Sequence, residues 1–495
     1  MKQHALYKAI VLSMGIASVA GVAFADDTPV TANGATLNLG SIKLTAGGFV
    51  EGAVIERNRN EVADVASKLQ SIPVPTTDNY HTNEFRMSGR QSRVSLLAQG
   101  PDMDGAKAEA YYEADFLGTG VSSNSTQSNS YVLRVRQAFG DYTMDNGFQI
   151  LAGQAWSLVT QNKNGINARG ENVPLTVDAQ YVAGFDWTRN SQVRLTDKFS
   201  DMVTGALSFE SPQAVAGGSK PGNVGTIVTG EAGGSLLNNA CTQGNTSTPA
   251  ATSTTTTTCT GQQYTTDPMP DIILKFAFDP GYGHYEVFGM NRHFRDRVDP
   301  AAIPAGDTTA AQAGSNSTTT ATSFGASVLL PLVPKMLDFQ ASYLGGKGLG
   351  RYGTSNLPDY TYKADGTLAA LKGTDYLLGL VAHPDKQWDV YLYAGQEKSD
   401  TATDSTLATG VANTGYGLTT TCAAGVFTCG TALQKVSEIT AGFWYKFYQG
   451  EAQHMQVGLQ YGKITDTYFA DSVGNDNKVS MNEVMASFRY YPFSK

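Results

Sequence analysis

Residues 106–117 read AKAEAYYEADFL, and polar and apolar side chains alternate along this stretch. The odd positions from 107 to 115 carry Lys, Glu, Tyr, Glu and Asp, whereas the even positions from 108 to 116 carry Ala, Ala, Tyr, Ala and Phe. Successive side chains of a strand point to opposite faces, so one face would be charged and the other apolar. Such a strand fits a wall between water and lipid, and only a closed barrel satisfies every strand backbone group inside a bilayer. The stretch therefore predicts an all-β fold, a transmembrane antiparallel β-barrel.

The same two-residue period recurs to the end of the chain. Sixteen segments are predicted as strands: 41–56, 84–99, 106–117, 130–143, 147–158, 181–197, 201–211, 270–280, 283–295, 322–332, 336–346, 373–384, 386–398, 434–448, 452–466 and 479–493. An even number of strands returns the chain to its starting side of the membrane. Sixteen strands also enclose a lumen wide enough for water.

Short and long connections alternate between these strands. The short ones are 100–105, 144–146, 197–200, 281–282, 333–335 and 449–451, and they are rich in the turn residues Gly, Pro, Asp and Asn. The long ones are 57–83, 118–129, 159–180, 212–269, 296–321, 347–372, 399–433 and 467–478. This asymmetry is typical of bacterial barrels with short periplasmic turns and long extracellular loops. The low-complexity loop 212–269 could alternatively be an interdomain linker, although the strand rhythm resumes unchanged after it.

The N-terminus has the features of a secretory signal. Residues 1–25 combine Lys2 and Lys8, an apolar run over 9–22 and an A-x-A cleavage site at 23–25. The alternative is a membrane anchor, for which the apolar run is short of the roughly 20 residues that a spanning helix needs. We predict a signal peptide over 1–25, a short periplasmic segment over 26–40 and the barrel over 41–495.

Charge and cysteine content narrow the class further. The chain has 35 basic and 44 acidic residues, and removal of residues 1–25 leaves 33 and 44, a net charge of −11, which disfavours nucleic-acid binding. The four cysteines form two local pairs in predicted loops. The simplest of three pairings gives the disulfides Cys241–Cys259 and Cys422–Cys429. Zinc is the competing interpretation, but no histidine lies near either pair.

Charged side chains on the predicted lumen face would carry the chemistry of a pore. Arg134 and Arg136 alternate with apolar residues, and an arginine facing lipid at mid-membrane costs roughly 2–4 kcal/mol. Both should therefore point inward. Glu109, Glu113 and Asp115 lie on the polar face of the preceding strand, so an antiparallel pair would place these acids and arginines on one wall.

Further arginines extend this wall. Arg86 and Arg90 share strand parity, whereas Arg93 does not, so either a bulge intervenes or Arg93 lies at the rim. Arg194 lies between two apolar residues and should also point inward. The functional interpretation is a constriction with an anion-attracting arginine ladder beside carboxylates. The alternative is a structural salt-bridge network, and one set of charges can serve both roles.

The loop 159–180 is the best candidate for narrowing the pore. It carries Asn164, Arg169, Glu171 and Asp178, and Pro174 stiffens it. The alternative is a surface loop over the mouth. No G-x-S-x-G or H-E-x-x-H motif occurs, so the sequence predicts no catalytic residues, no metal site and no cofactor.

Several motifs together resemble the DcaP-like family of outer-membrane porins. They are Phe85–Arg93, Tyr112–Phe116, Leu133–Ala138 and Leu151–Ser157, with Asp178 and Arg189–Arg194 extending the likeness. The resemblance implies a trimer of sixteen-stranded channels that pass small anionic solutes such as dicarboxylates. The arginines at 86, 90, 93, 134 and 136 match the motif positions at the constriction. Family members can carry an N-terminal coiled coil, but about fifteen residues without heptads separate the predicted cleavage site from the first predicted strand, so we expect no such coiled coil here.

These observations predict a porin for passive diffusion in the outer membrane of a Gram-negative bacterium. Its expected partners are outer-membrane lipid, two further copies in a homotrimer, small anionic solutes and, during biogenesis, the barrel-assembly machinery, which could recognise Phe493. A non-conducting barrel acting as an adhesin or structural protein remains an alternative. A barrel hydrolase is a further one, although no polar triad can be assembled for it.

Overall fold

The structure is a computed structural model of the chain, and it consists mainly of antiparallel β-strands, as predicted. It describes residues 31–33, 36–118, 131–218, 227–229, 267–298, 314–402, 416, 432–451, 453–469 and 477–493. The predicted signal peptide and the four cysteines lie outside these residues. Among the described residues, no helix has the length and hydropathy required to cross a membrane.

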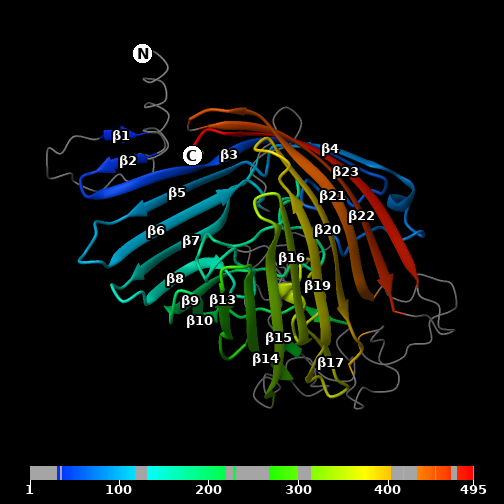
Figure 1. The fold of residues 1–495 in the computed structure, drawn as a ribbon. Helices are drawn as coiled ribbons and strands as arrows, with labels where there is room; N and C mark the ends of the chain where they lie inside the picture. Colours follow the sequence, from blue (N-terminus) through cyan, green and yellow to red (C-terminus); the bar gives the residue numbers. More distant parts are fainter. Residues whose placement is uncertain are drawn as a thin grey trace, which may run out of the picture.

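The barrel wall contains sixteen strand positions within the described residues (Figure 1). Its strands are β3 (Ile42–Arg57), β4 (Glu84–Ser88) with β5 (Arg93–Gln99) in one position, β6 (Lys107–Asp115), β7 (Arg134–Thr143), β8 (Gln149–Trp156), β9 (Arg189–Lys198), β10 (Val203–Glu210), β13 (Asp271–Phe278), β14 (His284–Val298), β15 (Ser315–Val333), β16 (Leu337–Lys347), β19 (Lys372–Ala382), β20 (Trp388–Ser399), β21 (Leu433–Gln449), β22 (His454–Tyr468) and β23 (Lys478–Tyr491). Each pairs antiparallel with its neighbours, and β23 pairs with β3 to close the ring. The predicted fold class and strand number are confirmed.

Short elements complete the described chain. They are β1 (Thr31–Asn33), β2 (Thr36–Leu39), β11 (Ala216–Gly217), β12 (Ile227–Thr229), β17 (Tyr360–Tyr362), β18 (Leu368–Ala370) and two 3₁₀ turns, Asp78–His81 and Gly350–Tyr352. The strands β1 and β2 extend the sheet from the start of β3, and β11, β17 and β18 form a separate small sheet.

The two faces of the wall differ as the sequence period requires. On β13 to β16, the outward side chains include Leu274, Val287 and Phe324, the last 66% exposed. Lys275 and Glu286, on the opposite face of the same strands, are fully buried inside the barrel. An apolar outer surface and a polar interior are the arrangement of a transmembrane barrel.

The predicted strand 84–99 is interrupted, which resolves the parity of its arginines. A turn closed by the hydrogen bond from Ser92 N–H to the Gly89 carbonyl separates β4 from β5, and both pair with β3. The interruption shifts the period by one residue. Arg93 therefore faces the lumen, as Arg86 does.

The predicted strand 181–197 was too long at its start. Residues 181–188 belong to the preceding loop, which runs over 157–188 and is called loop 3 below. Phe185 and Trp187 show the apolar alternation of a strand because they pack inside the lumen. In contrast, β15 begins at Ser315, seven residues before the predicted start, since its Ser- and Thr-rich beginning pairs with β14.

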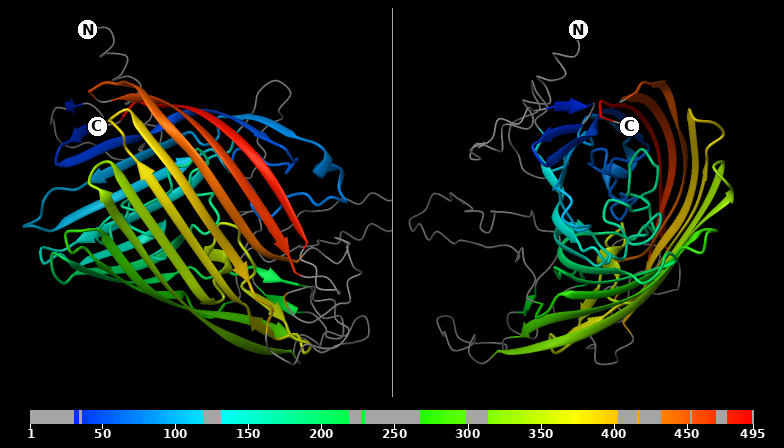
Figure 2. Two further views of the ribbon diagram at one scale, coloured as in Figure 1. Left: turned by 45° about the vertical axis from the view of Figure 1, so that its right-hand side comes forward. Right: turned by 60° about the vertical axis from the view of Figure 1, so that its left-hand side comes forward.

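Three long loops fold into the barrel, and the right-hand view of Figure 2 shows segments inside the ring of strands. They comprise residues 58–83, loop 3 and residues 348–371. Leu69 and Ile72 of the first pack on β21 to β23, and Tyr352 of the third packs with Phe288 and Met290. The lumen therefore contains apolar clusters as well as charged walls.

Candidate functional site

Loop 3 crosses the lumen and contacts the opposite wall. The Lys275 ammonium group of β13 donates to the Thr160 carbonyl at 2.9 Å. The Trp444 indole of β21 donates to the Leu175 carbonyl at 2.7 Å, and Val177 N–H donates to Oε1 of Gln460 on β22 at 2.6 Å. These bonds join one loop to strands far apart in the sequence, so the loop lies within the barrel rather than over its mouth.

The end of loop 3 at residues 183–186, called its stem below, contacts carboxylates of the barrel wall. Ala183 N–H donates to Oε2 of Glu438 at 2.9 Å, and Gly184 N–H donates to Oε1 of Glu397 at 2.8 Å. Asp186 and Asp375 of β19 are both buried carboxyl groups that interact with each other. Burial, together with the charge of Glu397, raises the pKa of Asp186 well above its usual range.

Gly184 permits this close seating, and its replacement by alanine is expected to displace the stem. Its φ is +82°, and an added Cβ would lie 1.9 Å from the Tyr376 carbonyl oxygen. We expect Gly184→Ala to lower the thermal transition in detergent and to change single-channel conductance. Gly281→Ala is the matched control, because Gly281 has φ +89° but open space around it. Left-handed strain alone costs about 1–2 kcal/mol, so equal effects of both variants would contradict a role for this contact.

Four arginines and two carboxylates form a cluster on the wall facing loop 3. Nη2 of Arg134 lies 2.6 Å from Oδ2 of Asp115, and Nε of Arg136 lies 2.6 Å from Oε1 of Glu113. Arg136 also reaches Asp115, at 3.0 Å. Arg93 lies 3.6 Å from Glu113. We call this set, with Arg189, the basic cluster; its formal charge is four positive and two negative.

Arg189 is the member that sequence reasoning missed. Its guanidinium lies 5.1 Å from the ring of Trp156 and 5.0 Å from that of Trp187. Nη1 is buried without a hydrogen-bond partner among the described residues. Its charged neighbours include Arg134, Arg136 and Asp115. Arg189 directly follows loop 3 and belongs to the motif Arg189–Arg194, and the neighbouring Trp187 is its one local sequence signal.

The remaining predicted arginines occupy other places. Arg86 pairs with Glu84 at 3.1 Å, and Arg90 pairs with Asp64 at 3.0 Å in the loop after β3. Arg194 is buried and donates from Nε to Gln192, and it has no carboxylate within ion-pair distance in the described chain. The structure therefore brings together three of the six predicted arginines, Arg93, Arg134 and Arg136.

The four predicted residues of loop 3 also lie in different surroundings. Arg169 pairs with Glu109 at 2.9 Å, and Glu171 is buried. Asp178 accepts a hydrogen bond from Ser67 N–H at 2.9 Å, which ties loop 3 to the loop after β3. Asn164 borders a cavity of about 650 Å³ beside the turns of β7 to β14.

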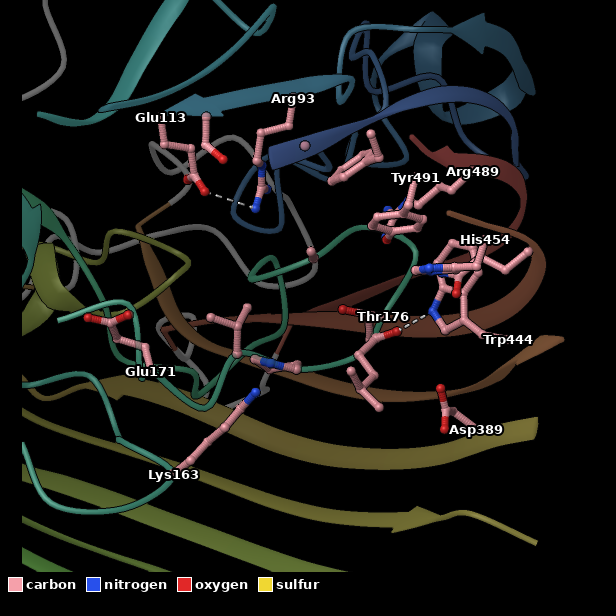
Figure 3. A pocket seen from close by; sticks show the side chains of 18 residues that line it. Arg93, Glu113, Lys163, Glu171, Thr176, Asp389, Trp444, His454, Arg489 and Tyr491 are labelled. Carbon is pink, nitrogen blue, oxygen red and sulfur yellow. Dashed lines mark hydrogen bonds and ion pairs between the residues drawn. The ribbon is translucent and has the colours of Figure 1, made fainter. Parts of the chain in front are cut away.

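A cavity of about 510 Å³ lies between loop 3 and the wall and is called the loop 3 pocket (Figure 3). Arg93 and Glu113 of the basic cluster line it, together with Arg489 from β23. Lys163 and Glu171 lie across the pocket from these arginines. Lys163 and Arg489 were not predicted; Arg489 had the parity of a lumen residue, but nothing in the sequence placed it beside β5.

No group of three or more His, Cys, Asp and Glu side chains in the described part of the chain could hold a metal ion. The lining of the loop 3 pocket includes guanidinium, ammonium and aromatic groups, together with the carboxylates of Glu113, Glu171 and Asp389. The guanidinium and ammonium groups bind and orient anions through charge and hydrogen bonds.

Solved structures share this fold. The outer membrane channel DcaP of Acinetobacter baumannii matches with a TM-score of 0.56 and 16% identity, over 91% of this chain and 97% of that chain. An anion-selective porin from Comamonas acidovorans matches at 11% identity over 91% and 99% of the two chains, with a TM-score of 0.45. No family model matches the chain, and no curated protein matches it. The match to DcaP confirms the fold that the sequence resemblance implied.

Proposed function

We propose that this chain is a porin of the Gram-negative outer membrane that lets small hydrophilic anions diffuse passively. The observation that carries the proposal is the basic cluster, in which Arg93, Arg134 and Arg136 pair with two carboxylates and Arg189 adds a fourth guanidinium group beside loop 3. A ring of excess positive charge at a narrow part of a wet path favours anions. Export by a signal peptide, insertion by the barrel-assembly machinery and assembly into homotrimers belong to the same proposal.

Planar-bilayer recording of the purified protein tests this function. In a KCl gradient, we expect ohmic single-channel steps and a reversal potential on the side of chloride. A reversal potential on the side of potassium would contradict anion preference. Absence of conductance would favour the alternative of a plugged structural barrel, to which the apolar clusters of the three inward loops lend support.

The anion preference should weaken as the pH rises through neutrality. Burial raises the pKa of Glu171 to about 7, against the opposing effect of Arg194. Glu171 is therefore mainly neutral at pH 6 and negative at pH 8, which adds one negative charge to the pocket. At ~10 Å in water one charge contributes about 0.4 kcal/mol, against chloride and in favour of potassium, so the permeability ratio of chloride to potassium should fall about fourfold. Glu171→Gln should remove this dependence, and an unchanged pH profile in that variant would exclude Glu171 as its source.

A further inference from the structure

One apolar side chain is presented to the loop 3 pocket by a fixed backbone. Leu175 is 36% exposed although it lies inside the barrel. Its N–H donates to the Tyr393 hydroxyl at 3.2 Å, and its carbonyl accepts from the Trp444 indole at 2.7 Å. Val173 and Pro174 line the pocket beside it. These bonds fix the exposure of Leu175, and with Val173 and Pro174 it forms an apolar surface on which an apolar group of a solute would be removed from water.

The opposite side of the pocket combines cations with aromatic rings. Arg93 and Arg489 lie 5.3 Å and 4.8 Å from the ring of Phe49, and Arg489 lies 4.3 Å from that of Trp444. Tyr491 packs on Phe49 with ring centroids 5.1 Å apart. Stacking on rings fixes the position of a guanidinium group while leaving its edge free to donate hydrogen bonds.

Two cations of the loop 3 pocket, Arg93 and Lys163, are incompletely neutralised. Glu113 lies 2.6 Å from Arg136 but 3.6 Å from Arg93, and it also accepts a hydrogen bond from the Tyr111 hydroxyl. Nε of Arg93 is buried without a hydrogen-bond partner. Lys163 is exposed and makes no ion pair among the described residues. Both side chains line the loop 3 pocket, as do the carboxylates of Glu113, Glu171 and Asp389, so an anion that enters can meet either cation.

We infer that the loop 3 pocket is a transit site for organic monoanions that carry an aromatic or branched apolar body, of which arylalkanoates are the simplest members. The carboxylate would bind Arg93 and Lys163, and the apolar body would lie on Leu175 and Val173. A cavity of about 510 Å³ is within the usual size range of small-molecule sites. The inference rests on the proposed function, since it names the solutes that such a channel would retain longest.

Solute-dependent reduction of the KCl current through the full-length mature protein tests the inference. Phenylacetate and acetate carry the same charge and differ in the ring. We expect phenylacetate to half-saturate at a concentration about tenfold below that of acetate. In Leu175→Ser, the half-saturation concentrations of phenylacetate and acetate should lie within about threefold of each other. In Leu175→Met, the tenfold difference should remain, because methionine preserves the apolar contact.

Two further variants separate the charge from the apolar surface. Lys163→Gln should raise the half-saturation concentrations of both solutes by similar factors. Lys198→Gln, which alters the cavity beside the turns, should change neither concentration. Val173→Thr, nearly equal in shape, provides a second apolar-side variant if Leu175→Ser fails to fold. Equal half-saturation of the two solutes in the unmodified protein would overturn the inference, as would an undiminished difference in Leu175→Ser. Failure of the proposed function would appear separately, as a cation-side reversal potential without added solute.

Discussion

Replacing Arg134 and Arg136 together by glutamate is expected to convert the proposed anion preference of the channel into a cation preference. The basic cluster holds four positive and two negative groups, so two charge reversals change its formal charge from +2 to −2. Charge at a constriction determines which ions enter it, so the reversal potential in a KCl gradient should change sign. Arg134→Gln with Arg136→Gln, which gives a formal charge of zero, should fall between the two.

A control with the same total change of charge separates this local effect from the overall charge. Lys198→Glu with Lys386→Glu alters exposed residues at the turns and should shift the reversal potential only slightly, since exposed charges are screened. An unchanged reversal potential in the Arg134 and Arg136 variant, with folding shown by unaltered circular dichroism, would remove both residues from the selectivity role.

The largest loss of stability is expected from Arg57→Met. The Arg57 side chain is fully buried and lies 3.2 Å from Glu84, 3.4 Å from Glu483 and 3.6 Å from Glu61. Its removal leaves Glu61 and Glu483 without an ion-pair partner among the described residues, and it leaves Glu84 with Arg86 alone. Loss of one partner from a buried ion pair costs about 3–5 kcal/mol, so the thermal transition in detergent should fall strongly. Arg169→Met is the control, because its pair with Glu109 is partly exposed and should contribute at most about 1 kcal/mol.

Acid should partly rescue the Arg57→Met variant. Burial raises the pKa of Glu61 to about 7 even beside Arg57, and loss of the arginine raises it further. The neutral form of this carboxyl group is favoured below that pKa, so the variant should lose less stability at pH 5 than at pH 8. A loss independent of pH would show that packing, rather than unpaired charge, is the cause.

The period of the sequence determines the barrel, but it does not determine the path of the inward loops. Alternation in stretches such as 106–117 predicted sixteen strands because lipid and water impose opposite chemistry on the two faces. The same argument placed Arg134 and Arg136 beside Glu113 and Asp115, since antiparallel neighbours share a wall. Phe185 and Trp187 gave the wrong signal, because a loop buried inside a barrel needs apolar residues as a strand does.

The alternation of polar and apolar residues could not predict which residues from distant segments meet in the candidate site. Arg489 reaches Phe49 only because β23 closes the ring against β3, and Lys163 faces Arg93 only because loop 3 crosses the lumen. Leu175 is one apolar residue in a polar loop, and its exposure depends on bonds to Tyr393 and Trp444. Contacts between segments hundreds of residues apart follow from ring closure, which periodicity alone does not locate.

The seam between β3 and β23 has a consequence for how the protein enters its membrane. Arg57 of β3 and Glu483 of β23 meet across this seam, 426 positions apart in the sequence. The backbone groups on this edge of β3 therefore have no hydrogen-bond partner until β23 pairs with them. Until then the growing sheet has two open edges, and lipid offers no hydrogen bonds to either of them. Closure of the ring therefore depends on the C-terminal strand, and both edges of the sheet lack hydrogen-bond partners until β23 pairs with β3.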